Sequence, residues 1–346
     1  MKRLDVLVLG AGFGGLTAAV RLAEEGHHVT CLSDELPGAS WHNFGQLHSG
    51  AVYAPVLPEV AAACWKHRSR WSTLLQNSVA TRTGIGLFQD AANAPRYVDM
   101  WKRLGIPVRP LTAGQVRDHG LLVTEPPAAG FLLPDLVVDV AALHTALHRK
   151  ARKEGAVIEH IASARLVRRG SQAAVRTSSS ELREADTVVL AAGHRTAQLL
   201  DLLGIEHPLA VSRLPYGVLP DCRRHIPLTY HLDGDLLAVS PQNHGLHVAL
   251  PGRPDDRASD AAQHYRLAAA LSRHWPQLPV EKLELRWGKV AEVQGQTPDP
   301  SVAVADLGGP ATGWGRVGNL VVCLPGKWTT AWHGADLIAQ AVARRG

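Results

Sequence analysis

Apolar residues at the start of the chain change from a continuous run to a helical spacing and then back to a run. Residues 5–9, DVLVL, form a short apolar stretch of the kind that makes a buried parallel strand. Between residues 16 and 23, apolar side chains recur every three or four positions on one helix face, and Gly26 ends that pattern. Residues 28–32 resume a strand pattern. The opening stretch therefore predicts a strand, a turn, a helix and a second strand.

The predicted turn carries glycines at the spacing of the dinucleotide fingerprint. Gly10 would allow the tight turn, Gly12 the approach of a pyrophosphate to the backbone, and Gly15 the close packing of helix on sheet. Phe13 and Gly14 lie inside the same turn, and we expect them to contact the cofactor too. The phosphates would meet the helix N-terminus, where free N–H groups and the helix dipole favour an anion.

The end of the second predicted strand departs from the usual pattern. An acidic residue normally stands there and binds the ribose hydroxyls. In this chain Ser33 takes that place, and Asp34 and Glu35 follow it. Either Asp34 has taken over the ribose contact or Ser33 makes a weaker one.

The next hundred residues contain fewer regular patterns. Residues 36–55 are rich in glycine, histidine and aromatic residues without periodicity, and such stretches beside a nucleotide fold are usually functional. Residues 57–105 have helical spacing, with a separate short helix over residues 97–104. Turn residues and a Pro-Pro pair predict connecting structure over residues 111–130.

A second helix and strand follow at residues 139–154 and 157–161. Residues 164–168 and 173–177 predict a small meander. The run DTVVLAAG, residues 186–193, predicts a buried strand whose small last residues leave room for something close to its C-terminal end.

From residue 208 to residue 250 the pattern changes to short strands separated by turn residues, which predicts an antiparallel sheet. A helix over residues 266–275 and a strand over residues 280–290 follow. Residues 319–324 predict a last buried strand, after which the chain ends in a helix.

Composition narrows the class of protein further. The 346 residues are 46% hydrophobic, which is enough for one large or two smaller domains. The net charge of +5 comes from scattered basic residues, so no nucleic-acid-binding stripe is expected. The four widely spaced cysteines predict free thiols in a reducing compartment, and we expect no metal site. No apolar run is long enough for a membrane span, and a cytoplasmic protein is expected.

The opening fingerprint, the VVLAAG strand and the GKWTT segment before the last helix make the chain resemble the D-amino-acid-oxidase-like family of FAD-dependent oxidoreductases. The resemblance covers nearly the whole chain. It implies an α/β fold in which a Rossmann-like FAD-binding domain is interleaved with an α+β substrate domain built on an antiparallel sheet. It also implies that Ala164 lies on the adenine side and that Gly193 passes the pyrophosphate. The implied FAD-binding domain covers residues 1–50, 132–206 and 295–346, and the substrate or cap domain covers 51–131 and 207–294.

Two local similarities lie in the irregular segment. GASWHNFGQL, residues 38–47, resembles the segment of dimethylglycine and sarcosine dehydrogenases in which a histidine is covalently attached to the flavin. This implies a covalent bond to FAD through His42, or, as the alternative, a histidine that only lines the flavin pocket. GQLHSGAVYAP, residues 45–55, is similar to a segment of L-2-hydroxyglutarate oxidases and implies catalytic roles for His48 and Tyr53. The other residues of these segments expected to contact the cofactor are Ser40, Trp41 and Gly45.

A third local similarity lies near the C-terminus. GKWTT resembles a motif of glycerol-3-phosphate dehydrogenases, and it adds Lys327 as a catalytic and cofactor-binding residue. Hydride transfer to flavin N5 leaves negative charge on the ring, and Lys327 together with a helix N-terminus capped by Thr329 and Thr330 would stabilise that charge. The residues of this motif expected at the cofactor are Gly326, Lys327, Trp328, Thr329 and Thr330.

These features predict an FAD-dependent oxidoreductase that takes a hydride from a small-molecule substrate of the hydroxy acid or polyol type. An alcohol must lose its O–H proton as the carbonyl forms, which requires a base, and His48 is the first candidate. His231, His333 and Tyr216 are the next candidates. The alternatives are an amine or amino-acid oxidase or dehydrogenase of the same fold, and a dinucleotide-binding protein without redox turnover. The electron acceptor is O2 or unknown, and neither Arg213 nor Arg286 is assigned to the substrate.

Overall fold

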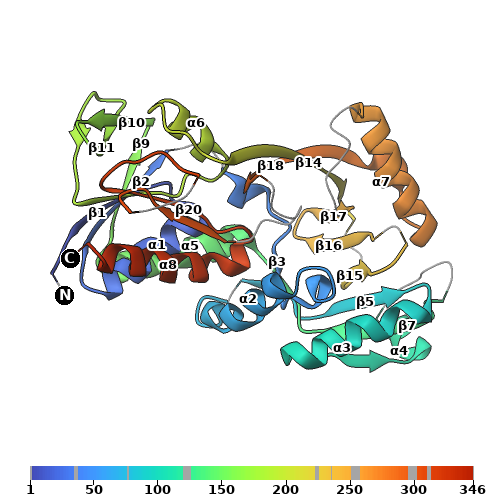
Figure 1. Cartoon of the computed structure of the whole chain (residues 1–346). Helices are drawn as coiled ribbons and strands as arrows, with labels where there is room; N and C mark the ends of the chain where they lie inside the picture. The colour runs from blue at the N-terminus through green and yellow to red at the C-terminus, as the bar shows by residue number, and fades with distance from the viewer. Residues whose placement is uncertain are drawn as a thin grey trace. The chain divides into compact units, whose positions relative to one another are not determined.

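Runs of valine and leucine form the centre of a mainly parallel sheet, because strands covered on both faces need apolar side chains on both sides. The computed structural model describes residues 2–34, 38–75, 78–119, 126–222, 226–234, 236–250, 258–294, 302–309 and 313–345 (Figure 1). The six-stranded sheet has the order β19-β20-β13-β1-β2-β9. β19 runs antiparallel to β20, and the other four pairs are parallel. The strands are β1 (Asp5–Leu9), β2 (His28–Asp34), β9 (Val157–Ile161), β13 (Thr187–Leu190), β19 (Ala303–Asp306) and β20 (Leu320–Leu324).

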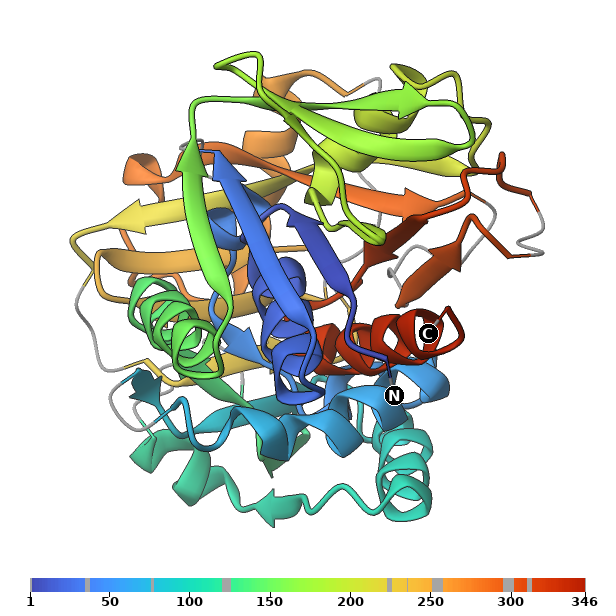
Figure 2. The ribbon, with the colours of Figure 1, turned by 90° about the vertical axis from the view of Figure 1, so that its left-hand side faces the viewer.

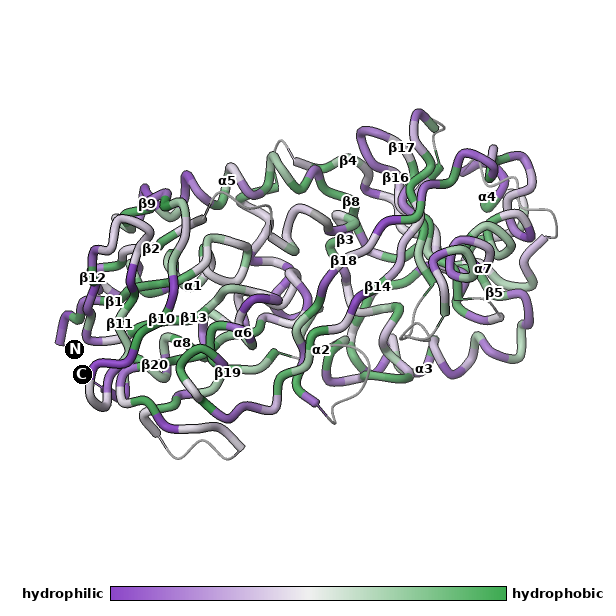
Figure 3. Tube along the Cα trace, turned by 90° about the horizontal axis from the view of Figure 1, so that it is seen from above, coloured by the Kyte–Doolittle hydropathy of each residue, from purple (hydrophilic) through white to green (hydrophobic). Residues whose placement is uncertain are grey.

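Both faces of this sheet are covered. Figure 2 shows helices α1 (Phe13–Glu24), α5 (Val140–Lys153) and α8 (Ala331–Ala343) on one face. The other face carries a small antiparallel sheet and the short helix α6 (Thr196–Asp201). Leu7 and Leu32 of the large sheet share one apolar core with Leu166 of the small sheet. In Figure 3 β13 and β20 are coloured as hydrophobic, as expected of buried strands. The small sheet consists of β10 (Ala164–Arg169), β11 (Gln172–Thr177) and β12 (Leu182–Arg183).

A second, largely antiparallel sheet of eight strands has the order β18-β14-β17-β16-β15-β5-β7-β6. Within it β15 and β5 run parallel. Helix α7 (Asp260–His274) packs on this sheet through residues such as Leu267 and Leu271. The strands are β5 (Gly84–Phe88), β6 (Arg109–Leu111), β7 (Ala129–Leu133), β14 (Leu209–Pro220), β15 (Leu228–His231), β16 (Ala238–Gln242), β17 (Gly245–Ala249) and β18 (Glu284–Val293).

A separate apolar cluster joins this sheet to the helices that precede it in the chain. Ala61, on helix α2 (Pro58–Arg68), and Trp101, on helix α3 (Ala94–Leu104), pack with Phe88 of β5. A short helix, α4, covers Ala113–Asp118. A three-stranded sheet in the order β3-β8-β4 completes this part of the chain, with β3 at Gln46–Leu47, β8 at Leu136–Val138 and β4 at Val79–Thr81. The 3-10 helices are η1 (Ala39–His42), η2 (Ala51–Tyr53), η3 (Ser69–Trp71), η4 (Ala91–Asn93), η5 (Gly193–Arg195), η6 (Val280–Lys282) and η7 (Trp328–Thr330).

The chain divides into two compact units, each built from separated segments. Unit 1 consists of Met1–His42, Ala141–Ser212 and Lys289–Gly346, and unit 2 consists of Asn43–Val140 and Arg213–Gly288. Two stretches that we expected in the cofactor domain, residues 43–50 and 132–140, are part of unit 2. The long strands β14 and β18 each begin in one unit and end in the other.

The α/β class is confirmed, and β1 and β9 agree with prediction to the residue. The prediction of helical structure over residues 57–105 holds at its two ends, where α2 and α3 lie, and is wrong between them, where β4 and β5 lie. Residues 111–130 are more than a connection, since they contain α4 and the start of β7; residues 120–125 lie outside the described part of the chain. The strand expected over residues 280–290 begins instead with η6, so that β18 starts at Glu284.

Two expectations from composition concern the cysteines and a membrane span. Cys31, Cys64, Cys222 and Cys323 are all free, and Cys222 is the one that is not buried. In the parts of the chain that the structure describes, no helix has both the length and the apolar character needed to cross a membrane.

Candidate active site

The glycine-rich turn of unit 1 is shaped by backbone contacts that exclude side chains. Gly10 has a φ of +111°, and a Cβ there would lie 2.5 Å from the carbonyl oxygen of Ala191. A Cβ on Gly15 would lie 1.7 Å from the Gly10 carbonyl oxygen. The residues that follow β13 are small because the backbone of Ala191 comes close to the turn. The turn in front of α1 therefore holds a fixed shape that excludes side chains at positions 10 and 15.

The N-terminus of α1 is suited to an anion. Gly12 is its N-cap and gives no side-chain cap, and the first turn carries no acidic residue. The Phe13 N–H donates to the Ser40 hydroxyl at 3.2 Å, so the predicted residue Ser40 does lie at this turn. A Cβ on Gly12 would come within 2.9 Å of that hydroxyl oxygen. The helix dipole and the lack of a Cβ at position 12 together fit a pyrophosphate.

His144 of α5 also belongs to this turn and was not predicted. Its Nε2 lies 2.8 Å from the carbonyl oxygen of Ala11, and its ring lies edge-on to Phe13 and tilted against Trp41. Burial lowers the pKa of His144, while the bond to Ala11 works in the opposite direction. A neutral His144 that donates to Ala11 holds the turn from the side of α5. Trp41 remains 47% exposed.

The C-terminal motif reaches the same turn. The Trp328 ring stacks on Phe13 with 5.3 Å between ring centroids, and a Cβ on Gly14 would touch Pro325 at 3.1 Å. Thr330 takes the N-cap position of α8, but its hydroxyl donates to the carbonyls of Pro325 and Lys327 instead of capping an amide. Lys327 is in extended backbone just before η7, Gly326 has a φ of +67°, and Thr329 is fully buried.

The remaining predicted cofactor residues are more dispersed. Ser33, near the end of β2, pairs in register with His160 of β9, and Asp34 pairs with Ile161. Ala164 begins β10, and Gly193, with a φ of +57°, begins η5. The Asp34 and His42 side chains and the whole of residues 35–37 lie outside the described part of the chain.

The backbone of unit 2 explains why position 45 is a glycine. Its φ is +65°, and a Cβ there would lie 2.3 Å from the Val138 carbonyl oxygen. The Val138 N–H in turn donates to the Gly45 carbonyl at 2.8 Å. A glycine at position 45 is therefore required by the approach of β8.

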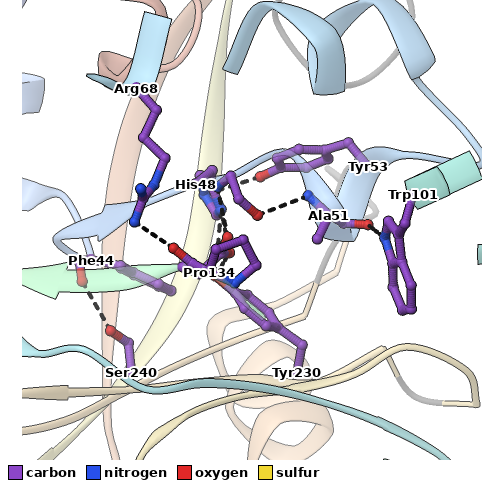
Figure 4. A network of polar contacts seen from close by, with 11 residues as sticks. Phe44, His48, Ala51, Tyr53, Arg68, Trp101, Pro134, Tyr230 and Ser240 are labelled. Carbon is purple, nitrogen blue, oxygen red and sulfur yellow. Dashed lines mark hydrogen bonds and ion pairs between the residues drawn. The ribbon is translucent and has the colours of Figure 1, made fainter. Parts of the chain in front are cut away.

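A buried polar network in unit 2 contains the predicted residues His48 and Tyr53 (Figure 4). The Tyr53 hydroxyl lies 3.2 Å from His48 Nε2. On the other side of the ring, His48 Nδ1 lies 3.5 Å from Asp135 Oδ2 and 3.4 Å from the Tyr230 hydroxyl. Tyr230 donates to Asp135 Oδ2 at 2.9 Å, and the Ser49 N–H donates to Oδ1 at 2.6 Å. His48 is thus held at both ring nitrogens by protein groups.

The charge in this network lies on Asp135, which is completely buried. Burial raises the pKa of a carboxyl, but hydrogen bonds from His48 and Ser49, together with the electrostatic attraction of the His48 ring, outweigh it and leave the pKa of Asp135 below its usual value. Burial and the nearby Asp135 raise the pKa of Tyr230 well above 10. Arg68, whose guanidinium donates to the Pro134 carbonyl, has its pKa lowered by burial while Asp135 works in the opposite direction. Asp135 is therefore an ionised carboxylate and Tyr230 a neutral phenol at neutral pH.

A second group of side chains gathers on the antiparallel sheet of unit 2. The rings of Phe44, Tyr216 and His247 contact one another with centroids 5.3 to 5.7 Å apart. Burial, followed by the charge of Arg286, lowers the pKa of His247 to about 4. Burial raises the pKa of Tyr216, which Arg286 opposes. A cation thus lies near a neutral imidazole and a neutral phenol. Arg286 also pairs with Glu284 at 2.8 Å.

The other residues considered as bases or substrate-binding cations lie elsewhere. His231, at the end of β15, stacks on His274, and Arg213 lies over the Trp287 ring at 4.2 Å. His333 lies in the first turn of α8 in unit 1. Of the network residues that were not predicted, Asp135 had a signal in the sequence, since a lone carboxylate inside FLLPDLVV needs a reason to be buried. His144 and Tyr230 had none, because helical and strand periodicity account for both positions.

Comparison with known proteins decides what kind of molecule carries these features. Residues 5–341 match the family described as FAD dependent oxidoreductase, DAO. The chain belongs to this family. As an FAD dependent oxidoreductase it binds FAD, and the turn described above fits the phosphates of that cofactor. FAD, when bound, supplies the group that accepts the hydride.

Solved structures agree with this FAD dependent oxidoreductase in fold. Iminodiacetate oxidase from Chelativorans sp. BNC1 is 20% identical with a TM-score of 0.75, covering 98% of this chain and 95% of that one. Glycine oxidase from Geobacillus kaustophilus is 20% identical with a TM-score of 0.74, covering 100% and 96%. L-proline dehydrogenase from P. horikoshii is 15% identical with a TM-score of 0.72, covering 99% and 94%. A search of curated proteins finds no match.

Proposed function

We propose that this FAD dependent oxidoreductase oxidises an amine that also carries a carboxylate, as in an amino acid or an N-substituted glycine. The observation that carries the proposal is the state of His48, whose Nε2 contacts Tyr53 and whose Nδ1 contacts Asp135 and Tyr230. Direct proton abstraction from an alcohol by this imidazole would require one of these contacts to break. A neutral amine can release its hydride without such a base.

The sheet of unit 2 offers a means of binding the carboxylate. Arg286 is the cation whose charge acts on Tyr216 and His247, and both of these side chains are neutral at pH 7. A guanidinium and a phenol suit the two oxygens of a carboxylate, because both donate hydrogen bonds to it. The structural neighbours support the same proposal, since they include an iminodiacetate oxidase, a glycine oxidase and an L-proline dehydrogenase.

Oxidation of a 2-hydroxy acid is the second candidate. It is favoured by the contact between Tyr53 and His48, which matches the segment similar to L-2-hydroxyglutarate oxidases, and by Asp135 behind the ring. In this case Tyr53 would take the hydroxyl proton and pass its own proton to His48.

Anaerobic bleaching of the bound flavin separates the two candidates. The panel contains glycine, sarcosine, iminodiacetate and proline on one side, and 2-hydroxyglutarate, lactate and glycerol 3-phosphate on the other. We expect an amine to reduce the flavin, with a rate that rises with pH as the neutral amine becomes more abundant. Reduction by a hydroxy acid alone would overturn the amine proposal. The same samples mixed with air show whether O2 serves as the electron acceptor.

We also propose that His42 carries FAD covalently. The support is the GASWH segment, its place in η1, and the contact of neighbouring Ser40 with the α1 turn. Acid precipitation of the purified protein should leave the yellow colour in the pellet, and the intact mass should exceed that of the chain by one FAD. In His42→Ala the colour should pass to the supernatant. Wild-type protein that releases all its flavin has no such bond.

A further inference from the structure

In the hydrogen-bond network around His48, counting protons shows which group donates and which accepts in each hydrogen bond. Asp135 is ionised and can only accept. The Tyr230 hydroxyl has a single proton, and its contact with Asp135 Oδ2 at 2.9 Å is shorter than its contact with His48 Nδ1 at 3.4 Å. A hydrogen bond to a charged acceptor is also the stronger one. The Tyr230 proton therefore points to Asp135, and Tyr230 turns a lone pair toward His48.

The tautomer of His48 follows from this assignment. Its Nδ1 faces two acceptors, the Asp135 carboxylate oxygen and the Tyr230 oxygen, so Nδ1 carries the proton. In the neutral imidazole Nε2 is then an acceptor. The Tyr53 hydroxyl, 3.2 Å from Nε2, must donate to it. With its proton directed at His48, Tyr53 keeps only lone pairs for any other partner.

We infer that Asp135 is the positioning residue that fixes the tautomer of His48 and thereby makes the Tyr53 oxygen an acceptor for the N–H of the substrate, while Tyr230 donates to Asp135. This inference rests on the proposed amine substrate. Tyr53 is the half-buried member of the network, whereas His48, Asp135 and Tyr230 are buried. An acceptor at that point selects a substrate that donates a hydrogen bond. It does not suit a carboxylate, which instead needs the donors of the sheet.

The same arrangement of donors and acceptors allows a proton to pass from the substrate through Tyr53 to His48. A substrate bound as an ammonium ion gives one N–H proton to the Tyr53 oxygen as the Tyr53 hydroxyl proton moves to His48 Nε2. The products are a neutral amine and an imidazolium, which Asp135 stabilises across Nδ1. No electrons move in this step. Among the residues that the structure describes, Arg68 acts on this network through its charge on Asp135, and Cys64 acts on Tyr230.

The tautomer can be measured without any substrate. Long-range 1H–15N spectra of the FAD-loaded protein with 15N-labelled histidine distinguish a protonated from an unprotonated ring nitrogen, and the His48 signals are those missing in His48→Gln. We expect Nδ1 to be protonated and Nε2 unprotonated in the wild type. In Asp135→Asn the amide can donate to Nδ1, and the proton should move to Nε2. A wild-type His48 that is protonated at Nε2 would overturn the inference.

Asp233→Asn is the matched control. Asp233 is a buried carboxylate of the same unit that accepts hydrogen bonds from the N–H groups of Gln89 and Asp90 and from the Asn93 amide. Its loss should destabilise the fold without changing the His48 spectrum. Tyr230→Phe removes one hydroxyl while Asp135 stays in place, so His48 should keep its Nδ1 proton. This variant keeps the measurement possible if Asp135→Asn does not fold.

Kinetics test the consequence for catalysis. With an amine that reduces the wild-type flavin, Asp135→Asn should slow reduction by about 100-fold near pH 7, the lower end of the usual contribution of proton transfer. The deficit should shrink toward high pH, where the amine is already neutral, and Asp233→Asn should show no such pH dependence. A deficit that stays constant with pH would mean that Asp135 has only a structural role. If no amine reduces the flavin, the proposed function fails, while the tautomer is still decided by the spectra.

Discussion

Glycines in the cofactor turn differ in what an added side chain would meet. At Gly15 a Cβ would collide with the Gly10 carbonyl oxygen at 1.7 Å, and backbone atoms cannot move away without breaking the turn. At Gly12 the nearest atom is the Ser40 hydroxyl oxygen at 2.9 Å, and this side chain can rotate. A side chain at position 15 would therefore disrupt the fold, whereas a side chain at position 12 would fill the space in which phosphates bind.

We expect Gly12→Val to fold but to lose FAD, because its side chain occupies the approach to the N-terminus of α1. Gly15→Ala should instead lower the free energy of unfolding by several kcal/mol, about the size of a severe steric defect. Flavin absorbance after purification and thermal unfolding separate the two effects. Gly38→Ala is the control, since a Cβ there meets nothing within 4 Å. A Gly12→Val protein with wild-type affinity for FAD would show that the pyrophosphate lies elsewhere.

Lys327 lies next to Trp328, which stacks on Phe13 of the cofactor turn. A cation there acts on charge that develops during hydride transfer, so Lys327→Met should slow flavin reduction at least tenfold, a loss of about 1.4 kcal/mol of transition-state stabilisation. The affinity for FAD should change less than the reduction rate. Rapid-mixing reduction and FAD titration give the two quantities. Weaker binding with unchanged reduction would assign Lys327 a structural role.

Candidate site residues could be named from the sequence where a local motif carries them. The glycines, Ser40, His48, Tyr53 and Lys327 stand in such motifs. Asp135 and Tyr230 are separated by 95 positions and meet through the pairing of β5 with β7 and β15, which no local pattern records. The sequence motifs thus identified Tyr53 on one side of the His48 ring. They did not identify Asp135 and Tyr230 on the other side, where the negative charge lies.

Helices and strands could be predicted from the sequence where the regular spacing of their apolar residues continued over a long, uninterrupted stretch. Strand β5, with the sequence GIGLF, was not predicted because it has five buried residues in a row without alternation and follows a helical stretch. Its burial comes from neighbours far away in the sequence, with β7 on one side and β15 on the other. A central strand with both faces covered looks locally the same as a buried helix segment, so only the tertiary structure decides.

One junction between elements is expected to depend on pH. The His231 ring, at the end of β15, stacks on His274 of α7 with centroids 3.8 Å apart, and Trp275 Nε1 donates to His231 Nε2 at 3.3 Å. Burial, followed by the charge of His274, lowers the pKa of His231 to about 3. The folded state therefore binds fewer protons here than the unfolded state, in which a histidine titrates near 6.5.

The stability contributed by a neutral His231 is complete above pH 6.5 and declines as the pH falls from there toward 3. We expect a loss of about 1.6 kcal/mol in the free energy of unfolding between pH 6.5 and pH 5 from this group. His231→Leu should unfold with a shallower dependence on pH over that range, measured by denaturant titration at several pH values. His28→Leu, at an exposed position, should keep the wild-type slope. Equal slopes in all three proteins would refute the assignment.

The whole molecule is discontinuous, because unit 1 needs segments from the start, the middle and the end of the chain. The Thr17 hydroxyl of α1 donates to the Ala331 carbonyl of α8 at 3.2 Å, and Lys150 of α5 pairs with Glu24 of α1 at 2.9 Å. The cofactor turn is thus supported by helices from all three segments. A ligand that binds this turn should stabilise residues that are remote in sequence.

Hydrogen exchange with and without FAD tests this. Binding raises the free energy of opening only for the structure that the ligand stabilises. Because His144 holds Ala11 and Ser40 holds Phe13, we expect slower exchange in the turn before α1, in η1 and in the first turns of α5. Exchange in α3 and α4, which belong to unit 2, should change little. His144→Ala should weaken the protection at the turn and raise the dissociation constant of FAD. Protection confined to α1 itself would show that its neighbours from the other segments do not respond to the cofactor.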